Sequence, residues 1–523
     1  MLIELKPMKR KNDEQVAAVL SALGKVAADY HQNPAYQQLL RNAHVSFDWI
    51  QYKKNFRPPV AERVAFDPDC QTVHHREVLI DLRQVEAETF ADQLRQLLDS
   101  WAPTMSPSRK LLESSFHEPN IHSSGDSTVA VIAPGVLGQR AVANATGKEK
   151  LYLEPFQPAR NSIIWSFNSL FWNALDKWEA SFNKGYEVSL PGGVTDACNP
   201  DFVAESVKQL CRVLDDLRAR EQLPEQIFVL EIGVGNGTHA RTWLDEFQRY
   251  TRDEPSYFDR LHYLMSDFSL CVLDGAREAV TAYLDKVSFL VMDATDPLKS
   301  LSFLRYKIMF IHISNVYDNL PSSELVRWDN QYYQVEVRAY LPLIEAEKIG
   351  EKYRLGGRDL MTTIIRFLKI GPEYFDDIEE GVRFWNDVWY ALKLEERCVL
   401  LPDLTHLKLF DGFDGMDVQT LLDDVGGNIR MHLNEMALKS FMNTVPLLHP
   451  RGIFQVQDIF VTDLEQYYTG FRGPGKYDGS VVNWVNGPLL RLVGKRCGYN
   501  VHFQPFVYRQ NSNITILTTS VRD

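Results

Sequence analysis

Three closely spaced glycines follow an acidic residue and an apolar run in the middle of the chain. Residues 227–230 are all apolar, which predicts a buried strand bounded by a turn, and Glu231 stands two positions before the first glycine. The segment 239–250 has helix-like composition. The glycines are Gly233, Gly235 and Gly237. A strand, a glycine-rich turn and a helix form the first half of a nucleotide-binding βαβ unit, in which a ligand approaches backbone that carries no Cβ atom.

The spacing of these glycines separates two classes of ligand. A dinucleotide-binding turn has its third glycine where this chain has Thr238. The pattern Glu-x-Gly-x-Gly-x-Gly instead resembles motif I of the class I S-adenosylmethionine (SAM)-dependent methyltransferases. SAM brings an amino-acid tail and a sulfonium to the turn rather than a pyrophosphate, so an acid such as Glu231 is favourable there. The resemblance implies SAM as cofactor and S-adenosylhomocysteine as product, with Glu231 and the three glycines as cofactor contacts. A turn without a ligand is the alternative.

Two aspartates end the next two predicted strands. Asp267 ends the strand predicted over 261–267, where a carboxylate can accept hydrogen bonds from both ribose hydroxyls. Asp293 ends the strand predicted over 287–293, and in the methyltransferase family an acid here typically contacts the adenine amino group. A lone aspartate at a strand end is more often solvated or a helix cap, so the prediction depends on the combination with the turn. The residues that follow these aspartates, Phe268 and Ala294, are also predicted to contact the cofactor.

The fourth predicted strand leads into a polar segment. Residues 307–314 are almost continuously apolar, which is typical of a central parallel strand buried on both faces. Ligands of open parallel sheets bind beyond the carboxyl ends of the strands. We therefore expect Ser314 to contact the cofactor, and Asn315 and Tyr317 to contact the methyl acceptor.

A general base helps if the methyl acceptor is a hydroxyl or an ammonium group, although the sequence leaves open whether one is needed. Asp318 and Tyr317 are the candidates for this catalytic role, because both follow the fourth predicted strand. His312 lies inside that strand and is predicted to be a core histidine. His312 and His239 are therefore weaker candidates for the base.

Composition limits the partners and the compartment. The chain has 523 residues with 45% apolar and 24% charged residues, as expected for a globular protein. Its net charge of −13 argues against bulk nucleic acid as a partner. The six cysteines form no Cys-x-x-Cys pair, which favours a reducing compartment. No apolar run approaches the ~18 residues of a membrane helix, and no signal peptide is recognisable. We expect a cytoplasmic protein, with no membrane contact and no metal, because no His/Cys spacing suggests zinc.

The sequence predicts an α/β fold built on a Rossmann-like, doubly wound sheet. An N-terminal α+β region and a mostly helical cap insertion are added to it. The four predicted regions are 1–185 (N-terminal), 186–321 (SAM-binding domain, first part), 322–428 (cap) and 429–523 (SAM-binding domain, second part). The cap is predicted to be helical because 324–349 and 373–394 have helix-like composition.

The last region is predicted to complete the sheet. Two closing strands, 499–508 and 513–519, are joined by so short a turn that they must be antiparallel, which is the arrangement known for class I methyltransferases. The other predicted elements are a helix over 429–445, a fifth strand over 453–460 and a helix over 480–496. Trp484, in this last helix, is a predicted substrate contact.

Two segments before the glycine turn have alternative interpretations. Residues 162–182 are aromatic and helix-like. A helix buried in the core is favoured over a surface that stacks on a substrate. The loop 191–193 can fold over the cofactor or be an ordinary turn before a helix.

The segment 316–321 suggests a closer relationship. It resembles the fourth-strand segment of the MidA-like family, which includes an arginine methyltransferase of mitochondrial complex I assembly. That family has Asn-Glu before the valine, where this chain has Ser314-Asn315, and a guanidinium acceptor normally needs a carboxylate clamp. We therefore expect methyl transfer to an O or N nucleophile of an unidentified acceptor, with a small molecule slightly favoured over a protein. A protein (arginine) methyltransferase, a non-catalytic SAM-binding assembly factor and an aminopropyl transferase remain alternatives, and the oligomeric state stays open.

Overall fold

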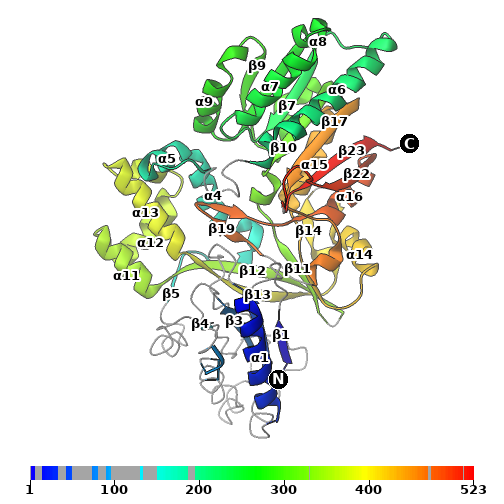
Figure 1. The fold of residues 1–523 in the computed structure, drawn as a ribbon. Helices are drawn as coiled ribbons and strands as arrows, with labels where there is room; N and C mark the ends of the chain where they lie inside the picture. Colours follow the sequence, from blue (N-terminus) through cyan, green and yellow to red (C-terminus); the bar gives the residue numbers. More distant parts are fainter. Residues whose placement is uncertain are drawn as a thin grey trace.

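The structure is a computed structural model of the chain. It describes residues 2–5, 14–32, 43–49, 74–80, 90–92, 94–95, 130–132, 150–186, 195–328, 330–410, 412–468, 473–510 and 512–522. The loop 191–193, which was expected near the cofactor, lies outside these residues. A seven-stranded sheet, a six-stranded sheet and a small N-terminal sheet follow one another from top to bottom of the molecule (Figure 1).

The seven-stranded sheet has the order β22-β23-β17-β10-β7-β8-β9. Its strands are β7 (Ile227–Ile232), β8 (Leu261–Asp267), β9 (Val287–Val291), β10 (Ile308–Ser314), β17 (Leu448–Asp458), β22 (Tyr499–Pro505) and β23 (Thr515–Val521). All neighbours pair in parallel except β23, which is antiparallel to both β17 and β22. The predicted Rossmann-like sheet with a closing antiparallel hairpin is confirmed.

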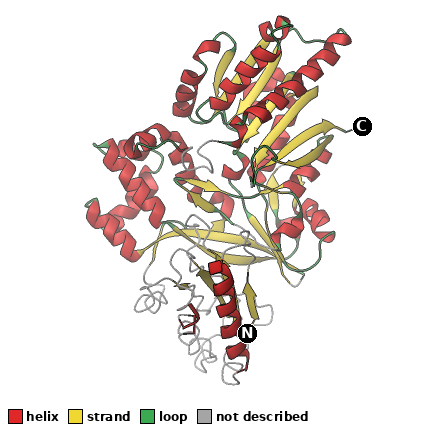
Figure 2. Ribbon diagram, viewed as in Figure 1, coloured by secondary structure: helices red, strands yellow, loops and turns green. Residues whose placement is uncertain are grey.

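Helices cover both faces of this sheet (Figure 2). One face packs against α6 (Pro200–Ala219), α7 (Thr238–Tyr250) and α9 (Leu270–Ala279). The other packs against α10 (Pro297–Leu301), α15 (Glu435–Thr444) and α16 (Gly487–Arg496). The helix α6 begins at Pro200 because the Asn199 side chain accepts the N–H groups of Asp201 and Phe202. Burial on both faces explains why β7 and β10 are almost entirely apolar.

The insertion after β10 is built on a sheet, so the prediction of a mostly helical cap is wrong in its first part. The sheet contains β5 (Lys150–Tyr152), β6 (Gln157–Pro158), β11 (Glu324–Trp328), β12 (Gln331–Pro342), β13 (Lys393–Leu401) and β16 (Ile429–His432). The stretch predicted as a helix over 324–349 is a β hairpin up to Pro342, where α11 (Leu343–Lys352) begins. Buried residues alternate along β12, a period of two that a strand requires.

Helices flank this sheet. They are α11, α12 (Gly357–Phe367), α13 (Ile378–Ala391) and α14 (Gly415–Asp423). The helix predicted over 373–394 is confirmed by α13. The helix predicted over 429–445 is wrong at its start, since β16 pairs with β11 before α15 begins. The helix predicted from 480 is also shorter: β20 (Ser480–Val482) and β21 (Val485–Asn486) precede α16.

Two helices before α6 carry the aromatic segment. They are α4 (Ile164–Asn173) and α5 (Leu175–Phe182), and their aromatic side chains lie mostly in the core. The prediction of a buried aromatic helix is confirmed, with a break at Ala174. The N-terminal sheet is parallel and contains β1 (Leu2–Leu5), β2 (Ala43–Trp49), β3 (His74–Ile80) and β4 (Ala130–Ile132), with α1 (Glu14–Gln32) beside it. The boundaries proposed for the four regions remain a prediction.

Candidate functional site

The glycine turn joins β7 to α7 in a backbone conformation that other residues rarely adopt. The φ angles of Gly233, Gly235 and Gly237 are +79°, +53° and +78°. A Cβ atom on Gly233 would collide with the side chain of Val316, and one on Gly235 would lie 2.6 Å from the hydroxyl of Tyr186. All three positions therefore require glycine.

The turn lies where the strand order of the sheet reverses. From β7 the chain continues to β8 and β9 on one side, and then to β10 on the other side. Ligands of doubly wound sheets bind at such a switch point, beyond the carboxyl ends of the strands. The carboxyl ends of β7 and β10 meet here, because the two strands are parallel neighbours. Gly237 fits against the backbone of α9 at Ala276, so it closes the helix packing below the ligand position.

Asp267 reaches the turn from the end of β8, as predicted. Its carboxylate accepts the N–H of Ser269 at 3.0 Å and the backbone N–H groups of Phe268 and Gly235. Burial raises the pKa of Asp267 to about 6, against which these three donors act. The ring of Phe268 next to it is 43% exposed. The structure thus brings an acceptor carboxylate and an apolar ring to the glycine turn.

Glu231 lies beneath the turn instead of lining it. Its side chain is buried, with Oε1 2.9 Å from Nδ1 of His239 and Oε2 accepting the hydroxyl of Tyr263 at 2.7 Å. Both carboxylate oxygens are therefore occupied by partners inside the protein. This differs from the predicted cofactor contact, because the side chain at this register points into the layer under α7 rather than past the end of β7.

Asp293 and Ala294 follow β9 at the same edge of the sheet. Asp293 is exposed, and its Oδ1 accepts the N–H of Thr295 at 2.8 Å. The carbonyl of Ala294 accepts the hydroxyl of Ser440 at 2.6 Å. This anchoring leaves the Asp293 carboxylate at the surface, beyond the end of β9.

The segment after β10 contains half-buried and fully buried residues. Ser314 and Asn315 are half-buried, and Asn315 has a φ of +51°. Its Nδ2 donates to the Thr195 hydroxyl at 3.4 Å. Tyr317, in contrast, is fully buried in the apolar cluster around α15. This position differs from the predicted catalytic and substrate-contacting role of Tyr317, since an acceptor could reach its ring only by displacing core side chains.

Asp318 forms a buried acidic pair with Asp458, the last residue of β17. Oδ2 of Asp458 accepts the backbone N–H groups of Tyr317 at 2.9 Å and of Asp318 at 3.3 Å. Burial raises the pKa of Asp318 to about 7. Burial and the neighbouring Asp318 raise the pKa of Asp458 well above its usual range. The pair therefore retains at least one proton at neutral pH.

Sequence reasoning missed Asp458 although a signal for it exists. Ligands bind beyond the carboxyl ends of parallel strands, and the fifth strand of the sheet ends at the same edge as the first four. Asp458 ends that fifth strand. Its proximity to Asp318 depends on the register between β10 and β17, in which Ser314 lies opposite Gln457.

A second group of missed residues comes from α4. Trp172 donates its Nε1–H to Oδ1 of Asn319 at 3.3 Å, and Asn168 donates to the carbonyl of Asn319 at 3.0 Å. The ring of Trp172 meets the ring of Tyr186 edge-on at 5.5 Å. The residues have a spacing of four, which places Asn168 and Trp172 on one side of a helix. This polar interruption of the aromatic segment is the signal that could have revealed a wall of the site.

Trp484 lies next in the chain to a residue that contacts Asp318. Its ring is half-buried against the apolar cluster around α15, and its carbonyl accepts the side chain of Asn434 at 3.2 Å. The preceding residue, Asn483, donates its backbone N–H to the carbonyl of Asp318 at 2.8 Å. Trp484 thus lies one residue from a contact of Asp318, but in a strand connection rather than in the predicted helix.

Fold and site together define a doubly wound α/β protein with a nucleotide-type glycine turn at its switch point. No protein-family model matches the chain, and no curated protein matches its sequence. No helix among the described residues is long and apolar enough to cross a membrane.

Three solved structures with a similar fold have names that mention methyl transfer or S-adenosylhomocysteine. A COG1565 superfamily member from Burkholderia thailandensis, bound to S-adenosyl-homocysteine, is 13% identical, covers 70% of this chain and 88% of its own, and has a TM-score of 0.41. The CcbJ methyltransferase from Streptomyces caelestis is 10% identical, covers 68% and 98%, and has a TM-score of 0.29. The trans-methyltransferase CalH, in complex with the same product, is 12% identical, covers 69% and 68%, and has a TM-score of 0.28.

Proposed function

We propose that this chain is a SAM-dependent methyltransferase, which transfers a methyl group to an O or N nucleophile and releases S-adenosylhomocysteine. The observation that carries the proposal is the three-glycine turn at the switch point, with φ angles that only glycine adopts readily, joined by the carboxylate of Asp267. The spacing of the glycines fits a nucleoside without a pyrophosphate.

The chain offers a contact for each part of the donor. The backbone of the glycine turn is placed for the amino-acid tail and the sulfur, next to the side chains of Val316 and Tyr186 that lie against Gly233 and Gly235. Asp267 accepts the two ribose hydroxyls, since its carboxylate already stands against the turn. The adenine lies beside Phe268, and the exposed Asp293 accepts its amino group. Ser314 closes the site from the end of β10.

The donor supplies an electrophilic methyl group on a sulfonium when it is bound. The residues of the chain then have to orient the acceptor, exclude water and accept a proton from the nucleophile. Asp318 is placed for the last task, because its pKa of about 7 lets the carboxylate both accept a proton and release it near neutral pH. Asp458 lies behind Asp318 and holds its backbone N–H, so it is a positioning residue.

The acceptor is proposed to be a small molecule, because Asp318 is almost completely buried, and Asn319, which donates to its carboxylate, is itself held by Trp172. A protein arginine acceptor and a non-catalytic role in assembly are the alternatives that the experiment below separates. Aminopropyl transfer is a second candidate function, and Asp458 favours it, since that reaction places an amine beside paired carboxylates.

The first experiment measures binding of SAM and S-adenosylhomocysteine by calorimetry, for the chain and for Asp267→Asn. The variant loses the charge that accepts the ribose hydroxyls, so its affinity falls by about 10- to 100-fold. Because the pKa of Asp267 is raised to about 6, the wild-type affinity also weakens as the pH falls below that value, and Asp267→Asn removes this dependence. Equal affinity of both proteins at all pH values would contradict the proposed ribose contact.

The second experiment adds methyl-labelled SAM and cell extract. A labelled small molecule supports the proposed acceptor class, a labelled polypeptide supports the arginine alternative, and binding without any labelled product supports a non-catalytic role. Asp318→Asn should still bind S-adenosylhomocysteine but lose turnover. Turnover that stays intact at all pH values would exclude Asp318 as the base.

A further inference from the structure

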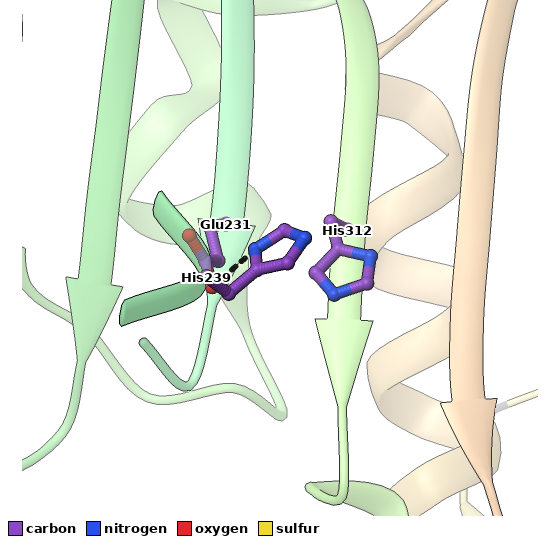
Figure 3. Close-up of side chains that lie close together, drawn as sticks. All are labelled: Glu231, His239 and His312. Carbon is purple, nitrogen blue, oxygen red and sulfur yellow. Dashed lines mark hydrogen bonds and ion pairs between the residues drawn. The ribbon is translucent and has the colours of Figure 1, made fainter. Parts of the chain in front are cut away.

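A cluster of three buried side chains lies directly beneath the glycine turn. Glu231 on β7, His239 on α7 and His312 on β10 are exposed by only 3%, 5% and 1%. One carboxylate or imidazole atom of each lies within 4.8 Å of the other two. Figure 3 shows the two imidazoles side by side, with Glu231 on the far side of His239. The rings of the histidines are 4.0 Å apart and nearly parallel.

His312 has donor and acceptor capacity that the surrounding protein leaves unused. Neither of its ring nitrogens has a hydrogen bond of good geometry to another described residue, although the Gln455 side chain lies close enough to act on its pKa. Its ring lies among Phe202, Phe310 and His239. Burial and the neighbouring His239 hold the pKa of His312 well below its usual range. A buried polar side chain without a partner normally costs stability, which calls for an explanation.

Two imidazoles and one carboxylate are a ligand set for a borderline divalent metal. Zn²⁺ and Fe²⁺ both bind two histidines and one acid, and the ligating histidine is the neutral form. A divalent ion would also compensate the buried charge of Glu231. The metal–ligand distances of about 2.0–2.2 Å require the three groups to close in from their present separation of up to 4.8 Å.

The groups around the cluster match the outer shell of a metal site. Tyr263 donates its hydroxyl to Oε2 of Glu231 at 2.7 Å, which orients the carboxylate and leaves Oε1 directed at His239. Gln455 lies opposite His312 on the adjoining strand, and Ser206 donates to its Oε1 at 3.3 Å. Such second contacts fix the orientation of metal ligands.

We propose that Glu231, His239 and His312 form a binding site for a divalent transition metal beneath the glycine turn. The ion ties β7, α7 and β10 together at the point where the turn begins. The role of this ion is structural rather than catalytic, because all three ligands are buried and lie under the turn rather than at the ends of the strands. No sequence pattern predicted this site, since the ligands come from three separate elements and share no zinc-type spacing.

The test uses the full chain, stripped with a chelator and then desalted, and Zn²⁺ as the probe. Calorimetry should show one ion bound per chain, and zinc should raise the melting temperature. Co²⁺ in its place should give the visible absorption of a nitrogen- and oxygen-ligated ion. His312→Phe keeps an aromatic ring in the stack but removes a ligand, so it should lose the binding, the thermal shift and the absorption.

Two further variants keep the test decisive. His262→Phe makes the same substitution at a half-buried histidine on β8 that pairs with Ser288, and it should bind zinc as the wild type does. Glu231→Gln keeps the shape of the side chain and weakens binding by about 10- to 100-fold or more, which decides the question if His312→Phe does not fold. The proposal is overturned if the wild type shows no saturable binding, or if the ligand variants bind zinc as tightly as His262→Phe. Neither result bears on SAM binding, which calorimetry with S-adenosylhomocysteine measures separately.

Discussion

The two large sheets differ in how their buried charged groups are paired. In the six-stranded sheet, Arg430 pairs with Glu324 and also with Glu396, at 3.0 Å and 3.1 Å. Arg327 there donates to three backbone carbonyls at the end of α14 and the following loop. In the seven-stranded sheet, no cation among the described residues compensates the acidic pair Asp318–Asp458, and the ring nitrogens of His312 have no hydrogen bond of good geometry within that part of the chain.

This difference distinguishes a structural region of the protein from a candidate binding or catalytic site. A buried charge that is fully compensated fixes one packing arrangement and has nothing left to offer a ligand. Buried groups that are uncompensated persist where binding or catalysis uses them. This contrast supports the proposal that the six-stranded sheet is structural and that the carboxyl edge of β7, β10 and β17 holds the site.

The largest effect is expected in the scaffold. Arg430→Met removes the cation between Glu324 and Glu396 and leaves two carboxylates together in the core, so the free energy of unfolding should fall by about 3–5 kcal/mol. Arg397→Met is the control, because its pair with Glu336 is half-exposed and contributes at most about 1 kcal/mol. Urea unfolding measures both. A loss for Arg430→Met no larger than that of Arg397→Met would remove the contrast between the sheets.

The next effect is expected at the glycine turn. Gly235→Ala forces a Cβ onto a residue with a φ of +53° and against Tyr186, which costs about 1–3 kcal/mol of strain. The affinity for S-adenosylhomocysteine should fall by about 10- to 100-fold, as measured by calorimetry. Gly275→Ala is the matched control, since this glycine in α9 has open space around it; it should keep the affinity and gain about 1 kcal/mol of stability. Wild-type affinity in Gly235→Ala would mean that the ligand does not use the turn.

The smallest expected effect is a pH dependence of the free energy of unfolding, and it tests the acidic pair of the seven-stranded sheet. Because the pKa of Asp318 is raised to about 7 and that of Asp458 is raised further, the folded chain binds more protons than the unfolded chain above about pH 4. The free energy of unfolding contributed by the pair therefore falls as the pH rises from about 4 to about 7. Asp458→Asn relieves the repulsion, so its stability relative to wild type should increase by about 1–2 kcal/mol between about pH 5 and about pH 8. A difference that does not change with pH would show that the carboxyls are not coupled.

The comparison also explains what the sequence could predict. The first four strands of the seven-stranded sheet and the glycine turn were predicted almost to the residue, since strands buried on both faces are continuous apolar runs and the turn has its own spacing. The strand β12 was mistaken for a helix. Its alternation of Val335, Val337 and Ala339 with polar residues is a strand pattern, but the Gln, Glu and Arg between them, and the helix that follows, favour a helical composition.

The contacts that make up the site lay beyond the reach of the sequence. Asp458 meets Asp318, and His312 meets His239, only through the register of β10 with its neighbours and the position of α7. Local patterns fix which residues end a strand but not which strand lies beside it. Tyr317 illustrates the same limit: it stands next to Asp318 in the chain, yet one residue of rotation in the short helical turn sends its ring into the core.

The interruption of the seven-stranded sheet affects how the chain is made. The strand β10 ends at Ser314, and its neighbour β17 begins at Leu448, about 130 residues later on a ribosome that adds about 5–20 residues each second. One edge of β10 therefore stays unpaired for roughly ten seconds, until β17 has been synthesised. During this time the nascent chain exposes an apolar strand edge. A chaperone that shields this edge during synthesis would protect the protein from aggregation at the moment when it is most vulnerable.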